Sequence, residues 1–174
     1  MAFVIGCGNE NKRELDMSQI VTILVGLPGS GKSTLLKQRT EVLFDDFHCC
    51  AFRDLTTFSA SRHFQALGAA LQSGKDCIIA DIAYCSGDRL REAEDGLRTL
   101  GSELGIELEI RHLFFANDAS ACRHNVVHRF SHEPARDYLA ELRNIDHFAR
   151  SYNPPANCMQ VRTCCAEIKC PASS

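Results

Sequence analysis

The stretch VGLPGSGKST, residues 25–34, follows the continuously apolar run IVTILV, residues 20–25, and leads into the helix-forming segment STLLKQRT. Residues 26–33 fit the Walker A spacing GxxxxGK[ST]. Glycines in this spacing let the backbone curl until successive N–H groups point inward at phosphate oxygens, and a helix that starts at the loop adds its positive end. The alternative is a chance glycine loop, which the flanking strand and helix disfavour. We therefore expect this loop to bind the phosphates of a nucleotide.

The polar residues of the loop have separate predicted roles. Lys32 supplies a positive charge to the β- and γ-phosphates, and Ser33 offers a hydroxyl ligand to Mg²⁺. Thr34 is expected to pack or cap beside the metal rather than to bind it. The predicted cofactors are therefore Mg²⁺ and ATP, which is the default nucleotide because no segment indicates a base preference. The expected nucleotide contacts are Gly26, Leu27, Pro28, Gly29, Ser30, Gly31, Lys32, Ser33 and Thr34.

Apolar runs alternate with helix signals along the rest of the chain. Besides residues 20–25, the expected strands are EVLF (41–44), DCIIAD (76–81) and IELEIRHLFF (106–115), with CMQVR (158–162) as a candidate edge strand. Five helices are expected between and after the strands. The first follows the glycine loop, the second ends at Gly74, the third runs from Ser86 to Gly101, the fourth covers residues 117–130, and the fifth begins at Pro134. This alternation predicts an α/β fold: a three-layer α/β/α sandwich with a mainly parallel sheet of about five strands.

Length and composition limit the class of protein. The 174 residues are 45% hydrophobic, which suits one domain at residues 18–162 between a flexible leader, 1–17, and a tail, 163–174. A formal net charge of −3 lacks the basic excess of proteins that coat nucleic acid. Because the apolar runs fall short of the roughly 18 residues of a membrane span and no secretory signal is evident, we expect a cytoplasmic protein without a membrane partner. The ten cysteines favour reduced thiols over zinc, although their C-terminal group leaves metal or redox chemistry as an alternative.

Acidic residues end two of the expected strands. Asp81 follows the apolar run CIIA and is expected to reach Mg²⁺ through water; the alternative is an ordinary strand-end acid or helix cap. Asp45 and Asp46 end another strand, and in a doubly wound sheet that edge faces the same crevice as the glycine loop. A carboxylate there can accept a proton from an attacking hydroxyl, whereas the alternative is a solvated acidic turn.

Five motifs together resemble one family. They are the Walker A stretch, FDDFH (44–48), IIAD (78–81), NDASACRHNVVHR (117–129) and SYNPP (151–155). The combination resembles the small P-loop kinases related to polynucleotide 5′-hydroxyl kinases and, more distantly, to zeta toxins and adenylate-kinase-like enzymes. The resemblance covers residues 20–162 and implies a P-loop NTPase fold with a helical lid at residues 117–135.

The resemblance also implies roles for single residues. Asp45 matches the general base, and Asp46 and His48 match substrate-holding positions, although the family usually carries an arginine where this chain has His48. Arg129 matches the arginine of the lid that stabilises charge on the transferred phosphoryl group, and we expect Arg123 to contact the nucleotide. The alternative for both arginines is a solvated basic helix face.

Two other groups of residues have a simpler interpretation. Arginines 136, 143 and 150 recur every seven residues and favour a solvated helix face. Histidines 112, 124, 128 and 132 favour surface or lid polarity over a zinc site, which needs a cage of ligands in space.

The sequence therefore predicts an ATP-dependent kinase that phosphorylates a hydroxyl group. The acceptor alternatives are a polynucleotide 5′ end, a nucleoside or another small alcohol, and the acidic net charge disfavours extended nucleic acid. Two other functions stay open: a non-catalytic nucleotide-binding switch or regulatory ATPase, which needs no acceptor base, and a toxin-like kinase of sugar nucleotides.

Overall fold

A computed structural model of the chain describes residues 18–45, 47, 58–132 and 137–164. The expected leader lies outside the described residues, as do nearly all of the tail and the predicted helix start at Pro134. The predicted substrate residues Asp46 and His48 also lie outside them.

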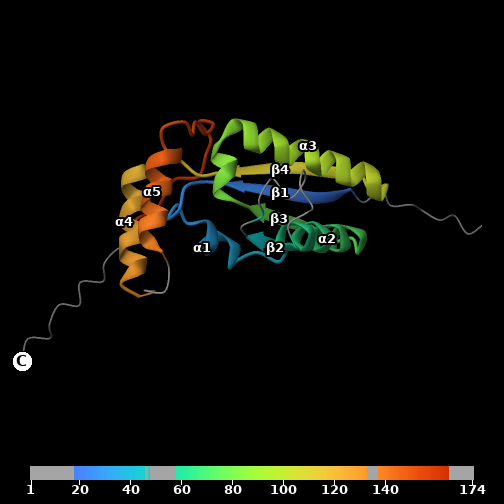
Figure 1. Ribbon diagram of the computed structural model, residues 1–174, viewed down its shortest axis with the longest axis horizontal. Coiled ribbons are helices and arrows are strands. Elements are labelled where there is room, and N and C mark those ends of the chain that lie inside the picture. Colours follow the sequence, from blue (N-terminus) through green and yellow to red (C-terminus); the bar gives the residue numbers. More distant parts are fainter. Residues whose placement is uncertain (1–17, 46, 48–57, 133–136, 165–174) are drawn as a thin grey trace, which may run out of the picture.

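The described strands form one parallel sheet (Figure 1). Its strands are β1 (Gln19–Val25), β2 (Val42–Asp45), β3 (Cys77–Ala80) and β4 (Leu108–Phe114), in the order β2-β3-β1-β4. Val21 of β1 lies beside Cys77 on one side and beside Ile110 on the other. The central strands β1 and β3 carry apolar residues that are buried on both faces of the sheet, as expected for continuously hydrophobic parallel strands.

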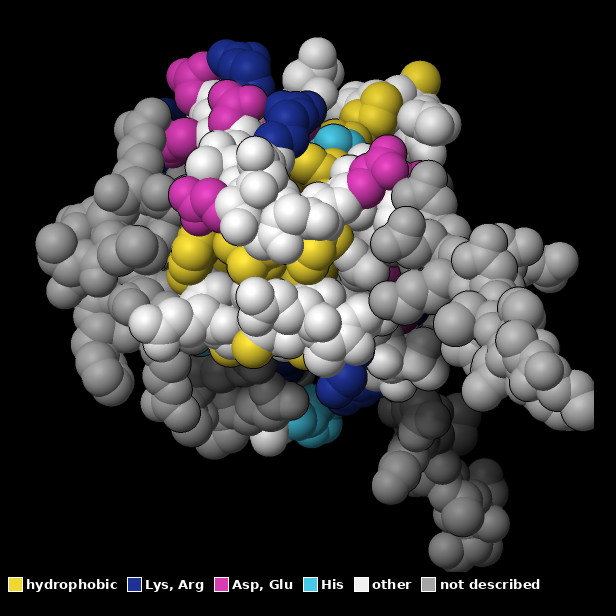
Figure 2. Space-filling view, turned by 90° about the vertical axis from the view of Figure 1, so that its right-hand side faces the viewer, with side chains coloured by type: hydrophobic (Ala, Val, Ile, Leu, Met, Phe, Trp, Pro, Cys, Tyr) yellow, Lys and Arg dark blue, Asp and Glu magenta, His cyan; other side chains and the backbone are white. Residues whose placement is uncertain are grey.

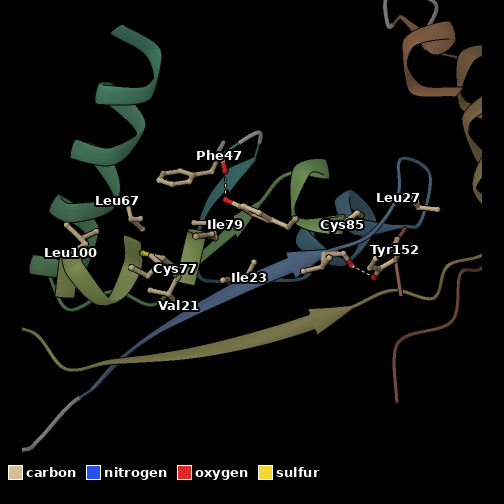
Figure 3. Packing of buried hydrophobic residues seen from close by; sticks show 14 of the residues in the cluster. Val21, Ile23, Leu27, Phe47, Leu67, Cys77, Ile79, Cys85, Leu100 and Tyr152 are labelled. Atoms are coloured by element: carbon tan, nitrogen blue, oxygen red, sulfur yellow. Dashed lines mark hydrogen bonds between the residues drawn. The ribbon is translucent and has the colours of Figure 1, made fainter. Parts of the chain in front are cut away.

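Helices cover both faces of this sheet, which confirms the predicted α/β arrangement. On one face, α2 (Phe58–Gln72) and α3 (Gly87–Leu104) pack over β1 and β3. On the other face, Leu36 of the short helix α1 (Lys32–Leu36) packs against Leu24 and Ile78. Each fully buried aliphatic side chain stabilises the fold by about 1.5–3 kcal/mol. Figure 3 shows Leu67 and Leu100 at one end of the larger core cluster, and Leu27 and Tyr152 toward the other.

The predicted fifth strand is reduced to a single bridge. Met159 N donates to Phe114 O and Ala116 N donates to Met159 O, each over 2.7 Å. Beyond this parallel bridge the main chain bonds to a side chain of a helix, not to the sheet, so the sheet of the described residues has four strands rather than about five.

One predicted helix end is wrong. We expected α3 to stop at Gly101, but the helix continues to Leu104 and ends at Gly105, whose φ of 65° is left-handed. Gly101 instead allows a close approach, because a Cβ there would meet the Leu108 side chain at 3.0 Å. Gly74, with a φ of 73°, follows the end of α2 as predicted.

The last two helices stand at the carboxyl ends of the strands (Figure 1). They are α4 (Ala119–Phe130) and α5 (Tyr138–Phe148); Asp118 caps α4 and Asp137 caps α5. The Tyr152 hydroxyl, just after α5, donates to Phe115 O over 2.6 Å and to Val25 O over 3.3 Å. These bonds join the end of the helix pair to the ends of β1 and β4.

Charged side chains are intermixed on the outer surface of α3. Seen from the end opposite α4 and α5, acidic and basic side chains lie next to each other at the top of the molecule, where α3 runs (Figure 2). No helix in the described part of the chain combines the length and the apolar character needed to span a membrane.

Candidate functional site

The glycine-rich loop, residues 26–31, connects β1 to α1 and is tightly curled. Gly29 has a φ of 76° and Gly31 a φ of 104°, both in the left-handed region that residues with a Cβ rarely adopt. A Cβ at Gly26 would lie 2.8 Å from Ser30 Oγ and 2.9 Å from Phe115 Cβ, so the loop also packs closely on itself and on the residue after β4. The glycines of the Walker A stretch therefore occupy positions where the backbone is left-handed or too closely packed for a Cβ.

Lys32 folds back over this loop. Its Nζ donates to Gly26 O over 2.5 Å and to Leu27 O over 3.0 Å. Burial lowers the pKa of Lys32, while nearby Cys85 and Asp45 act in the opposite direction. A buried ammonium whose charged form is disfavoured gains from any anion placed next to it.

The loop opens into a cavity of about 450 Å³, a size typical of small-molecule sites. Four parts of the described chain supply its walls: the glycine-rich loop with the start of α1, the ends of β2 and β3, the helix pair, and residues 162–164. The lining residues are Pro28, Gly29, Gly31, Lys32, Ser33, Thr34, Asp45, Asp81, Ile82, Asn125, His128, Arg129, His132, Glu141, Asn144, Arg162 and Cys164.

The two predicted strand-end acids come to the same cavity. Asp45 pairs in register with Ala80, so Asp45 and Asp81 stand at adjacent strand ends. Asp81 is 2% exposed, and its Oδ1 accepts from Ala83 N over 2.6 Å, which caps the 3₁₀ turn Ile82–Cys85. Asp81 is thus the helix cap that the sequence offered as an alternative, and it also lines the cavity.

The two predicted arginines of α4 lie apart. Arg129 lines the cavity and donates through its guanidinium to Glu141 of α5. Arg123 donates from Nε to Asp146 over 3.1 Å, and lies with His124 at a separate surface depression. Of the two, the structure brings Arg129 to the glycine-rich loop and places Arg123 elsewhere.

Sequence reasoning missed several lining residues. Asn125, Glu141, Asn144 and Arg162 have no predicted role, and Cys164 enters only as one of the C-terminal cysteines. A signal for part of the set was available, since Asn125, His128, Arg129 and His132 follow the spacing of one helix face. Nothing in the sequence indicated Arg162, because its position depends on contacts with a distant helix.

The histidines and cysteines of the described region do not form a metal cage. The rings of His124 and His128 on α4 and of His132 just after it follow one another, with centroids 6.5 Å and then 5.1 Å apart. Among the described residues, no three or more His, Cys, Asp or Glu side chains form a group that could hold a metal ion. Burial raises the pKa of the Cys85 thiol to about 12, which is typical of an unreactive structural cysteine.

Comparison with known proteins gives little further information. No family model matches the chain, and no curated protein matches it. One solved structure similar to the chain is described as "Structure of the Pnkp1/Rnl/Hen1 RNA repair complex". The two are 14% identical with a TM-score of 0.47, over 82% of this chain and 49% of that one, so this chain spans about half the length of its neighbour. A likeness this distant assigns no function.

Proposed function

We propose that this protein is an ATP-dependent P-loop kinase that transfers the γ-phosphoryl group to a hydroxyl of a small molecule, a nucleotide or a polynucleotide end. One observation carries the proposal: the curled Walker A loop opens into a cavity that also receives Asp45 and Asp81 from adjacent strand ends. A phosphate cradle beside strand-end carboxylates is the arrangement that phosphoryl transfer to an alcohol needs.

The glycine-rich loop and Lys32 form the nucleotide half of the site. With a triphosphate bound, we expect the Lys32 ammonium to leave its two carbonyl acceptors for the β- and γ-phosphates, which favours its charged form. The Ser33 hydroxyl and the Asp81 carboxylate supply the oxygen donors that Mg²⁺ prefers, so the residues present fit this ion. When bound, Mg²⁺ would neutralise phosphate charge.

Asp45 and the arginine side chains form the transfer half. The acceptor oxygen attacks the γ-phosphorus, the bond from this phosphorus to the β–γ bridging oxygen breaks, and Asp45 takes the acceptor proton. Arg129, oriented by Glu141, stabilises the charge on the transferred group. Arg162 lines the same cavity and adds a second positive charge there.

Transfer of label from γ-labelled ATP tests the proposal. The protein is incubated with Mg²⁺, labelled ATP and separate pools of 5′-hydroxyl oligonucleotides, nucleosides and small alcohols. We expect label in one pool, lost in Asp45→Asn although ATP still binds. Asp88→Asn, which changes an exposed acid of α3, is the control and keeps full activity.

The other outcomes discriminate between functions. ATP binding without transfer to any pool, unchanged by Asp45→Asn, contradicts the kinase and supports a nucleotide switch. Slow release of phosphate to water in every pool also contradicts it and indicates a regulatory ATPase. Growth arrest on expression, relieved by Lys32→Ala, supports the toxin-like alternative.

A further inference from the structure

Asn125, in the middle of α4, joins three segments of the cavity. Its Nδ2 donates to Gly29 O and to Arg162 O, and its Oδ1 accepts from Cys164 N, each over 2.8 Å. Gly29 is 96 residues away in sequence, and Asn125 itself is 8% exposed. One buried amide thus satisfies three main-chain groups that belong to two otherwise separate segments.

The glycine-rich loop packs closely against α4 at Gly29. A Cβ on Gly29 would lie 2.4 Å from Cys122 O and 3.0 Å from Val126 Cγ2. Cys122 and Val126 are both buried. The loop therefore rests directly on the helix backbone, within reach of the Asn125 amide, and Gly29 has no space to move closer to α4.

The other partner of Asn125 is the segment 162–164, which lacks sheet pairing. The parallel bridge to β4 ends at Met159. Beyond it, the Asn125 amide bonds Arg162 O and Cys164 N, and His124 Nε2 lies 3.1 Å from Cys164 O. Side chains of α4 thus hold in place the segment that carries Arg162 into the cavity.

We propose that Asn125 is a positioning residue, which holds the glycine-rich loop and the 162–164 segment in one arrangement so that the nucleotide meets a preformed site. The effect of Asn125 on nucleotide affinity rests on the proposed function, whereas the coupling of the two segments by its amide does not. Removing the amide leaves the partly buried carbonyls of Gly29 and Arg162 without their donors, which destabilises this arrangement.

A pair of matched asparagine variants of the full chain tests this inference. Asn125→Ala removes two amide donors from main-chain carbonyls. Asn117→Ala does the same elsewhere, because Asn117 Nδ2 donates to Ala149 O over 2.8 Å and to Tyr152 O over 2.7 Å without lining the cavity. Amide hydrogen exchange is measured in the unliganded proteins, and affinity for Mg·ATP is measured by calorimetry.

In Asn125→Ala we expect faster exchange in residues 26–31 and 162–164 together, and roughly tenfold or greater loss of Mg·ATP affinity. In Asn117→Ala we expect faster exchange near residues 149–152, with affinity unchanged. Asn125→Asp keeps the bond from Cys164 N but loses both donors, so residues 26–31 lose protection while the Cys164 amide keeps it.

Unchanged exchange in either segment of Asn125→Ala, or an affinity equal to that of Asn117→Ala, overturns the inference. If Asn125→Ala does not fold, Asn125→Ser, which retains one donor, replaces it and is compared with Asn117→Ala in the same two measurements. If the wild-type protein binds no Mg·ATP, the proposed function fails, and the exchange comparison still decides whether Asn125 couples the two segments.

Discussion

Helices α3 and α4 are both partly buried, but they use their polar residues differently. Most ion pairs of α3 lie within the helix: Arg98 donates to Asp95 over 2.9 Å and to Glu94 over 3.2 Å. Glu94 also reaches another element, with its Oε1 2.9 Å from His112 Nε2 of β4. On α4, Arg123 and Arg129 pair with acids of α5, and Asn125 bonds to the glycine-rich loop and to the 162–164 segment.

This difference indicates that α3 mainly stabilises the core, whereas α4 positions residues of the cavity. Pairs within one helix contribute little and fix nothing outside it. Pairs between elements fix the relative positions of the cavity walls. Substitutions on α3 should therefore act through stability alone, whereas those on the cavity face of α4 should act on binding and turnover.

The largest effect on stability is expected in the core face of α3. Leu97 is fully buried, so Leu97→Ala removes apolar contacts and leaves a cavity. We expect the free energy of unfolding to fall by about 2–5 kcal/mol, with nucleotide affinity unchanged where the variant is folded. Denaturant unfolding and calorimetry measure the two quantities. Leu139→Ala, at a leucine that is 52% exposed, is the control. A weaker nucleotide affinity in folded Leu97→Ala would show that α3 acts on binding as well as on stability.

Arg129→Ala should give the largest effect on turnover from α4. We expect kcat to fall by roughly 100- to 1,000-fold, the range for removing a donor that stabilises transition-state charge. Arg129→Lys should recover part of the rate only, since lysine lacks the planar fork that can bond Glu141 and a phosphate together. Steady-state kinetics check both variants, and a kcat within threefold of wild type for Arg129→Ala would contradict its role.

Glu141→Gln should have a smaller effect of the same kind. The substitution keeps the shape of the side chain but removes the charge that orients Arg129. We expect kcat to fall by about tenfold, the equivalent of one charge-assisted hydrogen bond, with little change in nucleotide affinity. Asp146→Asn, which changes the partner of Arg123, is the matched control and should leave kcat unchanged. Equal rates for the two variants would show that Glu141 does not position Arg129.

The smallest effects are expected from the exposed ion pairs. Arg123 and Asp146 are 48% and 52% exposed, against 28% and 21% for Arg129 and Glu141. Arg123→Ala and Arg98→Ala should each change the free energy of unfolding by less than about 1 kcal/mol, because exposed pairs are screened by water. Both should keep wild-type kcat in the same assays. A large loss of turnover in Arg123→Ala would instead support the nucleotide contact that the sequence predicts for this residue.

Much of the fold could be predicted because its signals are local. Continuous apolar runs identified the buried strands, and the Gly-rich spacing identified the β1–α1 turn. The end of α3 was mispredicted because Gly101 and Gly105 look alike in sequence, and packing against Leu108 decides which glycine lies inside the helix. The fifth strand could not be judged from its residues, because the Asn125 side chain of α4 bonds the Arg162 carbonyl at its end and Cys164 N just beyond it.

Some residues of the candidate site could likewise be predicted from local sequence, whereas others could not. Lys32 stands after the loop that follows β1, Asp45 ends β2 and Asp81 follows β3. Because the carboxyl ends of parallel strands meet at one edge of a sheet, the meeting of these residues could be anticipated. The separation of Arg123 from the cavity depends on the orientation of α4, which its sequence does not specify. The bonds of Asn125 to Gly29 and Arg162 span 96 and 37 residues, beyond any local pattern.

Calorimetric titration of Mg·ATP into wild type, Lys32→Met and Lys37→Met decides whether the glycine-rich loop binds a nucleotide triphosphate. Both lysines belong to the segment that starts at the glycine-rich loop, but Lys32 lines the cavity and Lys37 is exposed beyond the end of α1. We predict that wild type and Lys37→Met bind Mg·ATP alike, whereas Lys32→Met loses at least about tenfold in affinity, as for a lost charge-assisted contact. Equal affinity in all three proteins, or no binding by wild type, would contradict the assignment of this loop to a nucleotide triphosphate.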